Sequence, residues 1–440
     1  MIVEVEPRAG SDPRHPESHA LPGRSLAALL LVWVTVLVLM NQWGEAINER
    51  LTMKVLAPPL YGHFNFSLSP RVVIPIVVAL IVGWGARSRY RLTWRFFLVT
   101  AALASLLWGV SLAAVGPANL TDPLERHTDY LANLPLIDGV GEFVDGYADD
   151  LDSYTVHAEG HPPGALLFFW GLDRIGLGGA GAAAALILIA AASVVPAALL
   201  SVKEIAGEDL ARRAAPFLVL TPAAVWMVTS VDALFMALGA WGIWFMTLAM
   251  KRTGRRSDVS AVASGTVFGA GLFMSYGLVP LGLVVIALAI GLRRVRPLIV
   301  GGCALIAVAV LFAAAGFWWF DGLAATLERY AAGVAMQRPY SYFVIANLAA
   351  LSLALGPAVL AGLGRLRNRG MWILCGGALA AVAVADLSGL SKGEVERIWL
   401  PFVPWITLAA ASLPTAGTRL MLAAQSSVAL AIQVGVRTQW

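Results

Sequence analysis

The ionisable residues of this chain are concentrated in one polar segment that lies between apolar stretches. Residues 116–161 hold ten of the 27 carboxylates and three of the six histidines. Within this segment, Asp129 stands shortly after the end of an apolar stretch. A carboxylate held close to a membrane surface can accept a proton from a substrate hydroxyl group, because its usual pKa keeps it ionised. Asp129 is therefore a candidate catalytic base, although a solvated loop aspartate or a helix cap would suit the same position.

Other carboxylates compete with Asp129 for this role. Asp122 and Glu125 precede it in the same segment, and Glu45 and Glu49 follow the first apolar stretch. Four further aspartates could bind a divalent cation through their oxygens: Asp145, Asp149, Asp150 and Asp152. Their spacing is not that of an EF-hand, and a solvated acidic turn explains them more simply. The sequence therefore requires no cofactor and leaves a divalent cation as an alternative.

The polar segment ends in His161-Pro162-Pro163-Gly164. Proline lacks a backbone N–H and has a fixed φ, so it suits the first turn of a helix. The Pro-Pro pair would set the angle at which the chain enters the membrane, with His161 at the rim as a candidate substrate-binding residue. A purely structural helix start with a surface histidine explains the same run.

Later segments add further candidate binding residues. Asp232 stands at the end of a predicted span, and Arg397 comes just before Pro401. The planar fork of arginine suits phosphate oxygens, and Lys392 lies close by in sequence. An arginine whose head reaches the interface is the structural alternative. In a separate polar segment, 319–344, we expect Arg338 and Tyr340 either to contact a sugar ring or to anchor the chain at the membrane surface.

The elements that position these residues are predicted to be membrane-spanning helices. The chain is 59% hydrophobic and 13% charged, whereas soluble domains have about 25% charged residues. A span needs about 20 apolar residues. We predict an all-α polytopic membrane protein with thirteen spans: 25–42, 71–86, 96–115, 179–201, 214–229, 232–250, 258–275, 277–292, 298–318, 345–364, 371–387, 398–413 and 419–436.

The distribution of arginine and lysine predicts the orientation. Four basic links between spans are expected to be cytoplasmic: 87–95, 251–256, 293–296 and 365–369. Residues 116–161, 319–344 and 386–397 then lie outside, together with the C-terminus. An odd number of crossings is needed between 116–161 and the span 214–229, so we expect 161–177 to form a re-entrant or interfacial helix. Residues 1–23 are predicted to be a disordered cytoplasmic tail, and 24–440 a single transmembrane domain.

Several of these residues form a pattern that resembles the first external loop of the GT-C glycosyltransferases, such as protein O-mannosyltransferases and lipid A aminoarabinose transferases. In that family the loop begins with an acidic residue near a helix end and closes with His-Pro-Pro-Leu or Lys-Pro-Pro-Leu. The matching positions are Asp129-Tyr130-Leu131, Gly139, Gly141, Tyr154, His161-Pro162-Pro163-Gly164, Leu172 and Gly176. The resemblance covers 116–250 and extends more loosely to residue 414, with Asp232 and Arg397 at family-like positions.

This chain departs from the family pattern in two respects that affect the site. Two additional spans are predicted before the acidic loop, which is why Glu45 and Glu49 remain alternatives to Asp129. Gly164 replaces the leucine that is common after Pro-Pro, a change expected to relax the helix start without affecting chemistry.

The resemblance implies an inverting transfer of a sugar from a polyprenyl-phosphate donor, on the external face of the cell membrane. The acceptor would be a cell-envelope glycan, a glycolipid or a protein. Asp129 would be the base, and Arg397 and Lys392 would hold the donor phosphate. A transporter or flippase of envelope lipids is the alternative, but it should place ionisable residues near mid-membrane. A non-catalytic scaffold is a third possibility, which predicts no large cavity enclosed by the three external segments; wide separation of these segments would favour a scaffold or a transporter. The net charge of +4 comes from the basic links and indicates no nucleic acid partner.

Overall fold

The computed structural model describes residues 23–438 except 52, 54, 87–89 and 229. The predicted tail 1–23 therefore lies outside the described residues apart from Gly23. The α-helices are α1 (Gly23–Asn48), α2 (Val73–Gly85), α3 (Trp94–Ala113), α4 (Val140–Gly146), α5 (Val156–Glu159), α6 (Gly164–Arg174), α7 (Ala180–Ala206), α8 (Glu208–Val219), α9 (Ala224–Met227), α10 (Val231–Lys251), α11 (Gly254–Leu272), α12 (Gly282–Leu292), α13 (Arg296–Ala314), α14 (Trp319–Ala332), α15 (Val334–Gln337), α16 (Tyr340–Leu355), α17 (Pro357–Leu363), α18 (Arg369–Leu387), α19 (Val395–Ile398), α20 (Val403–Thr407) and α21 (Thr418–Gly435).

Short 3₁₀ helices and one two-stranded sheet complete the described part of the chain. The 3₁₀ helices are η1 (Pro70–Val72), η2 (Tyr130–Leu136), η3 (Leu151–Ser153), η4 (Tyr276–Leu281), η5 (Leu400–Phe402), η6 (Leu408–Ser412) and η7 (Thr415–Gly417). The strands β1 (His63–Phe64) and β2 (Val436–Arg437) pair antiparallel, with His63 opposite Arg437. This pairing joins the segment after α1 to the C-terminal end of the chain.

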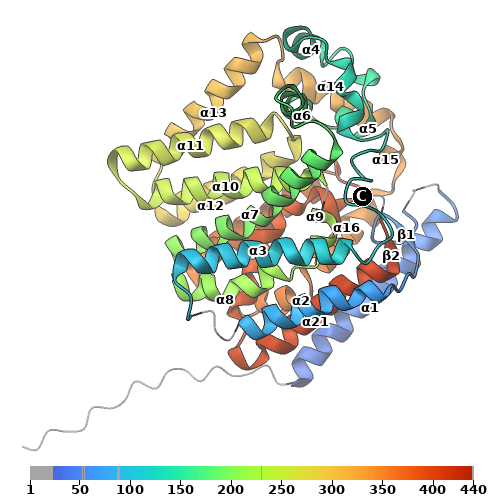
Figure 1. The fold of residues 1–440 in the computed structure, drawn as a ribbon, viewed down its shortest axis with the longest axis vertical. Coiled ribbons are helices and arrows are strands. Elements are labelled where there is room, and N and C mark those ends of the chain that lie inside the picture. The colour runs from blue at the N-terminus through green and yellow to red at the C-terminus, as the bar shows by residue number, and fades with distance from the viewer. Residues whose placement is uncertain (1–22, 52, 54, 87–89, 229, 439–440) are drawn as a thin grey trace, which may run out of the picture.

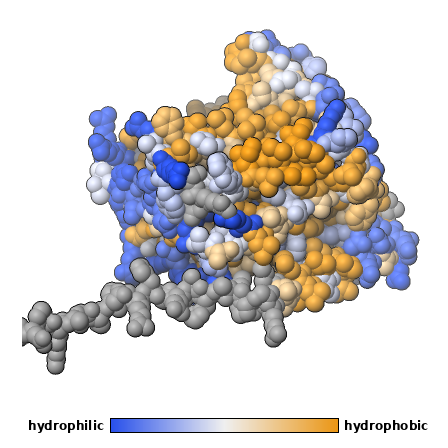
Figure 2. Space-filling view, turned by 60° about the horizontal axis from the view of Figure 1, so that its bottom comes forward, coloured by the Kyte–Doolittle hydropathy of each residue, from blue (hydrophilic) through white to orange (hydrophobic). Residues whose placement is uncertain are grey.

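The predicted all-α membrane class agrees with the structure, but thirteen continuous spans do not. Among the described residues, six helices are long and apolar enough to cross a membrane, and the number rises to eight if each of two sharply bent pairs is one span. The six helices are Ala27–Asn48, Trp94–Ala113, Ala180–Ala206, Val231–Lys251, Arg296–Ala314 and Arg369–Leu387. Apolar side chains on several of these helices are exposed, as expected for a surface that faces lipid. Figure 2 shows a broad hydrophobic surface with hydrophilic residues gathered toward its left and right edges.

Prolines and glycines account for the interrupted segments. The predicted span 345–364 bends by 103° between α16 and α17, where Gly356 has a φ of +79° and Pro357 begins the next helix. The predicted span 214–229 ends as α8 at Val219, and Pro222 separates it from α9. Because proline supplies no backbone donor and clashes with the preceding turn, these apolar stretches do not continue as single helices.

The helices have two chemically different ends. In Figure 1, α3, α7, α10 and α11 lie side by side, and α4, α5, α14 and α15 gather at one end of the molecule. α10 begins next to Asp232 and ends at Lys251 after 21 residues, a length of about 31 Å. Asp232 and the basic residues after α10 are therefore far apart, at opposite ends of the same helix.

The basic links lie together at the Lys251 end. Hydrogen bonds join them to neighbouring helix ends: Arg212 to the Leu92 carbonyl (3.0 Å), Arg252 to Glu204 (3.0 Å), Arg294 to the Met250 carbonyl (3.0 Å) and Arg369 to the Gly291 carbonyl (3.3 Å). We call this side the basic end and the opposite side, with residues 116–161, the acidic end. The common location is the arrangement that the positive-inside rule predicts.

The three segments predicted to be external contact one another at the acidic end. Arg329 of α14 bonds to Glu159 of α5 (2.9 Å), and the Tyr330 hydroxyl donates to the Gly389 carbonyl (3.2 Å). The structure therefore does not show the wide separation of these segments that would have favoured a scaffold or a transporter over an enzyme. Segment 319–344 is itself largely helical, since it consists of α14, α15 and the first turn of α16.

Candidate functional site

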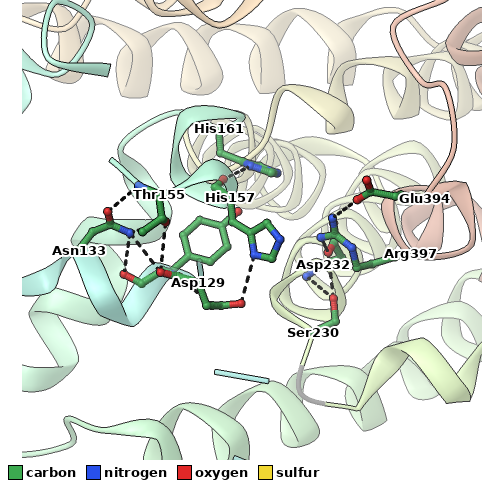
Figure 3. A network of polar contacts seen from close by, with 10 residues as sticks. Asp129, Asn133, Thr155, His157, His161, Ser230, Asp232, Glu394 and Arg397 are labelled. Carbon is green, nitrogen blue, oxygen red and sulfur yellow. Dashed lines mark hydrogen bonds and ion pairs between the residues drawn. The ribbon is translucent and has the colours of Figure 1, made fainter. Parts of the chain in front are cut away.

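Asp129 is held rigidly at the start of η2. Its Oδ1 accepts a hydrogen bond from the Tyr130 backbone N–H (2.7 Å), so the carboxylate caps this short helix. Its carbonyl accepts hydrogen bonds from the side chains of Asn133 (3.2 Å) and Thr155 (3.3 Å). Asn133 also binds Thr155, through its Nδ2 to Oγ1 (2.7 Å). The network joins the two halves of the acidic segment and fixes the direction of the carboxylate (Figure 3).

Asp129 is more deeply buried than the four carboxylates that compete with it for the role of catalytic base. Its side chain is 12% exposed. Glu45, Glu49 and Glu125 are exposed, and Asp122 accepts a hydrogen bond from the Asn119 backbone in its own turn (2.9 Å). Asp129 is also a helix cap, as the sequence suggested, because its Oδ1 caps η2. Its other oxygen, Oδ2, points to another ionisable residue.

That residue is His157, which the sequence did not single out. Its Nδ1 lies 3.2 Å from Asp129 Oδ2. His157 belongs to α5, a single turn between the aromatic residues of the acidic segment and the Pro-Pro pair. The imidazole therefore holds the second oxygen of the Asp129 carboxylate in one direction. The histidine enrichment of residues 116–161 was the sequence signal, but the partner could not be identified without the fold.

His161 lies beside this pair. A backbone carbonyl can only accept a hydrogen bond, so His161 Nδ1 carries a proton and donates it to the His157 carbonyl (2.7 Å). His161 is half-buried, and desolvation lowers the pKa of His161 to about 4, with Asp232 opposing the shift. The imidazole is therefore neutral near pH 7 and its Nε2 can accept a hydrogen bond. The helix start is also structural, as α6 begins immediately after Pro163.

Asp232 and Arg397 form an ion pair although they are far apart in sequence. Arg397 Nη1 donates to Asp232 Oδ2, and Arg397 Nη2 donates to Glu394 Oε2 (3.1 Å). Ser230, the cap of α10, donates its hydroxyl to Asp232 (2.9 Å). Burial alone would lower the pKa of Arg397, but Asp232 and Glu394 raise it above its usual value. The predicted phosphate-binding arginine is thus already bonded to two carboxylates of the chain.

Tyr130 connects the two groups of residues. Its ring packs against His157 and His161, with centroid distances of 6.3 Å and 5.7 Å. Burial raises the pKa of Tyr130 well above its usual value, and the charges of Asp232 and Asp129 raise it further. Figure 3 shows the Asp129–His157 pair and the Asp232–Arg397 pair in the same region of the acidic end. We call these residues together the acidic-end site.

The other three predicted binding residues lie beside this site and have structural contacts. Arg338 donates from Nε to the Met53 carbonyl (3.0 Å) and from Nη1 to the Lys392 carbonyl. Lys392 donates from Nζ to the Met336 carbonyl (3.2 Å). Tyr340 is 43% exposed and donates to the Leu387 carbonyl (3.3 Å). In the structure, all three hold polar segments in place, and only Arg338 and Lys392 are buried.

Glu396 is a further buried carboxyl group next to Arg397. Its Oε1 accepts a hydrogen bond from the Tyr61 backbone (2.7 Å), and its Oε2 has no hydrogen-bond partner among the described residues. The side chain is fully buried. Burial raises the pKa of Glu396 to about 7, although the Tyr61 N–H opposes the shift. This bond attaches the segment after α1 to the site.

The described residues contain no group of three or more His, Cys, Asp or Glu side chains placed to hold a metal ion. Asp145, Asp149, Asp150 and Asp152 are exposed, and Asp152 bonds to Arg329 (3.1 Å). The binding of a divalent cation by these four aspartates stays a prediction. A small cavity of about 10 Å³ lies at the basic end, lined by Arg213, Phe217 and Leu413 among others, far from the acidic-end site.

Comparisons with known proteins identify no family for this chain. No family model matches the sequence, and no curated protein matches it. Among solved structures, the chain is similar to the crystal structure of ArnT from Cupriavidus metallidurans in the apo state, with a TM-score of 0.40 and 15% sequence identity. The match covers 62% of this chain and 54% of the other, so it spans about half the length of that protein. A TM-score of this size does not establish a shared fold. The chain's own features define its class: an α-helical protein whose described part has six to eight apolar segments able to cross a membrane.

Proposed function

We propose that this chain is an inverting, GT-C-type glycosyltransferase of the cell membrane that uses a polyprenyl-phosphate sugar as donor. The observation that supports this most directly is that Asp129 and Arg397, 268 positions apart in the sequence, both lie at the acidic end. Tyr130 packs against His157, the partner of Asp129, and against His161. His161 in turn packs against Phe235 of α10 (5.4 Å), one turn after Asp232, the partner of Arg397. The motif resemblance of residues 116–250 supports the same class. The acceptor is a hydroxyl group of an envelope glycan, a glycolipid or a protein.

In the proposed reaction, the acceptor oxygen attacks the anomeric carbon of the donor while the bond from that carbon to the phosphate oxygen breaks. The in-line displacement inverts the anomeric centre. The acceptor proton passes to Asp129, which His157 orients. The electron pair of the broken bond leaves on the polyprenyl phosphate, and Arg397 stabilises the added charge. Such a site accelerates the reaction by orientation and by electrostatic stabilisation.

The remaining predicted residues have secondary parts in this proposal. His161, neutral near pH 7, accepts a hydrogen bond from the acceptor or the sugar. Asp232 keeps Arg397 oriented. Arg338 and Lys392 hold the segment that carries Arg397, and Tyr340 lies at the membrane surface. The acidic end faces outward and the basic end faces the cytoplasm.

The test measures sugar transfer in membranes from cells that express variants of the chain. We expect Asp129→Asn and Arg397→Ala each to lower the rate by about 10²-fold or more, because each removes a group that acts in the transition state. Arg397→Lys is the control for Arg397→Ala, because lysine keeps the positive charge opposite Asp232 and lacks only the guanidinium fork. Glu142→Gln, an exposed acid in the same segment, should have the wild-type rate. Wild-type transfer by correctly inserted Asp129→Asn and Arg397→Ala proteins would remove this mechanism.

A transporter of envelope lipids is the second candidate, since interrupted helices are common in transporters. The backbone groups at the interruptions are, however, satisfied inside the protein. The Ala223 N–H donates to the Ala354 carbonyl (3.0 Å), and Trp108 donates to the Thr221 carbonyl (3.1 Å). A transport site would direct such groups into a cavity. Movement of a labelled polyprenyl-phosphate sugar across proteoliposomes by the Asp129→Asn variant at the wild-type rate would favour the transporter.

A further inference from the structure

The two carboxylates that bind Arg397 differ in how firmly they are held. The side chain of Asp232 is 6% exposed, and it also accepts a hydrogen bond from Ser230 (2.9 Å). The side chain of Glu394 is 26% exposed, and Arg397 is its one hydrogen-bond partner among the described residues. Glu394 is therefore the more accessible of the two carboxylates that Figure 3 shows beside Arg397.

The backbone of Glu394 is strained, and hydrogen bonds hold the peptide groups on both sides of it. Glu394 has a φ of +63°, which is unfavourable for a residue with a side chain. Such strain is found where a local function maintains it. On one side, the Gly393 N–H donates to Asn347 Oδ1 (3.2 Å). On the other, the Glu394 carbonyl accepts from the Arg397 and Ile398 N–H groups (3.0 Å each).

These anchors leave the Glu394 side chain as the part that can move. Asn347 also donates to the Ser391 carbonyl (2.7 Å), and Arg338 donates to the Lys392 carbonyl. The peptide on both sides of Glu394 is thus hydrogen-bonded to other elements. A rotation about the Glu394 side-chain bonds would break its hydrogen bond with Arg397 Nη2 without any displacement of α19.

We propose that the Glu394 carboxylate and the phosphate of the polyprenyl donor compete for the same guanidinium group, Arg397; this inference rests on the function proposed above. Phosphate oxygens and a carboxylate bind the guanidinium fork in the same geometry. The phosphate takes the place of Glu394, while Asp232 keeps the arginine oriented. After transfer, the polyprenyl phosphate product occupies that position, and the return of Glu394 helps to expel it.

The test measures the binding of farnesyl phosphate, a short isoprenyl phosphate, to purified full-length protein in detergent. Glu394→Gln keeps the shape of the side chain and removes the charge that competes. We expect its Kd to be about fivefold lower than that of the wild type, an effect of the size expected for a partly exposed ion pair. Farnesyl phosphate should also inhibit sugar transfer by this variant more strongly. Glu142→Gln makes the same charge change at an exposed position and should leave the Kd unchanged.

A second variant separates competition from backbone strain. Glu394→Gly removes the carboxylate and also suits a positive φ, so competition predicts the same Kd for the glycine and glutamine variants. Equal or weaker binding by Glu394→Gln than by the wild type overturns the inference, as does tighter binding by the glycine variant alone, or no binding by any variant. Those results leave the transferase proposal intact if Asp129→Asn still abolishes sugar transfer. Unchanged transfer by Asp129→Asn and Arg397→Ala refutes the proposed function whatever the Kd values are.

Discussion

Glu396 is a carboxyl group in surroundings that disfavour its charge. It is fully buried, and its pKa is raised from 4.5 to about 7 mainly by desolvation. The folded chain therefore binds this proton more tightly than the unfolded chain does. Its contribution to stability is complete below pH 4.5 and is lost as the pH rises from about 4.5 to about 7.

The Glu396→Gln variant should remove this pH dependence. Glutamine resembles the protonated acid and can still accept the hydrogen bond from Tyr61. Thermal unfolding in detergent between pH 5 and 8 should show the wild type losing stability as the pH rises, by at most about 3 kcal/mol, and the variant changing less. Glu125→Gln, at an exposed position, provides the control. If the stability of the wild type and of Glu396→Gln changed in parallel with pH, the pH dependence could not be attributed to Glu396.

At the scale of single residues, the sequence predicted the types of group in the site better than their partners. Asp129, Asp232 and Arg397 were recognisable because charged residues next to apolar stretches are conspicuous. Their contacts with His157 and Glu394 were not recognisable, because these depend on side-chain directions in a short helix turn and in a segment with positive φ. Arg338 and Lys392 also illustrate this limit: the sequence suggested sugar or interface contacts for Arg338 and phosphate for Lys392, but it could not show that both donate to backbone carbonyls.

At the scale of elements, α6 shows that Gly164 has a packing role. The sequence suggested that this glycine only relaxes the helix start. In the structure, the Gly164 N–H donates to the Phe273 carbonyl (2.7 Å), and a Cβ at this position would lie 2.2 Å from the same oxygen. The first turn of α6 therefore contacts the backbone just after α11. This contact positions His161, three residues earlier, relative to the helix bundle.

The Gly164→Ala variant should consequently be destabilised. The added methyl group would contact backbone rather than a flexible side chain, so we expect a loss of about 1–3 kcal/mol, visible as a lower unfolding temperature in detergent. Gly171→Ala is the matched control in the same helix, since nothing lies within 4 Å of its added Cβ. Equal unfolding temperatures for Gly164→Ala and the wild type would show that α6 does not depend on this close contact.

The helices also show why the sequence located the apolar stretches but did not predict which of them bend or break. A hydropathy window measures the apolar content of a stretch, and bends do not change it. The stretch 345–364 is largely apolar, yet it bends by 103° at Gly356. The 3₁₀ and α turns of 398–412 follow from Pro401 and Pro404. Spacing of Gly and Pro within a span was the available signal, but whether such a residue bends or breaks a helix depends on the neighbouring helices that satisfy its backbone.

At the scale of the whole molecule, the arrangement of charge predicts how the protein lies in the membrane. The four basic links share one end, and the acidic-end site lies at the other. The positive-inside rule places the basic end in the cytoplasm. A donor whose lipid tail is in the outer leaflet would then meet Arg397 at the external surface, with the aqueous acceptor beside Asp129.

This orientation can be tested with single cysteines. The chain has two cysteines, Cys303 and Cys375, which would be replaced by alanine. Glu142→Cys introduces a thiol at the acidic end and Arg255→Cys introduces one at the basic end, both at exposed positions. A membrane-impermeant thiol reagent applied to intact cells should label position 142 and should label position 255 only after the membrane is permeabilised. Labelling of 255 alone in intact cells would place the site in the cytoplasm, where a cytoplasmic donor would have to replace the one proposed. Labelling of both positions without permeabilisation would contradict the separation of the two ends by a bilayer.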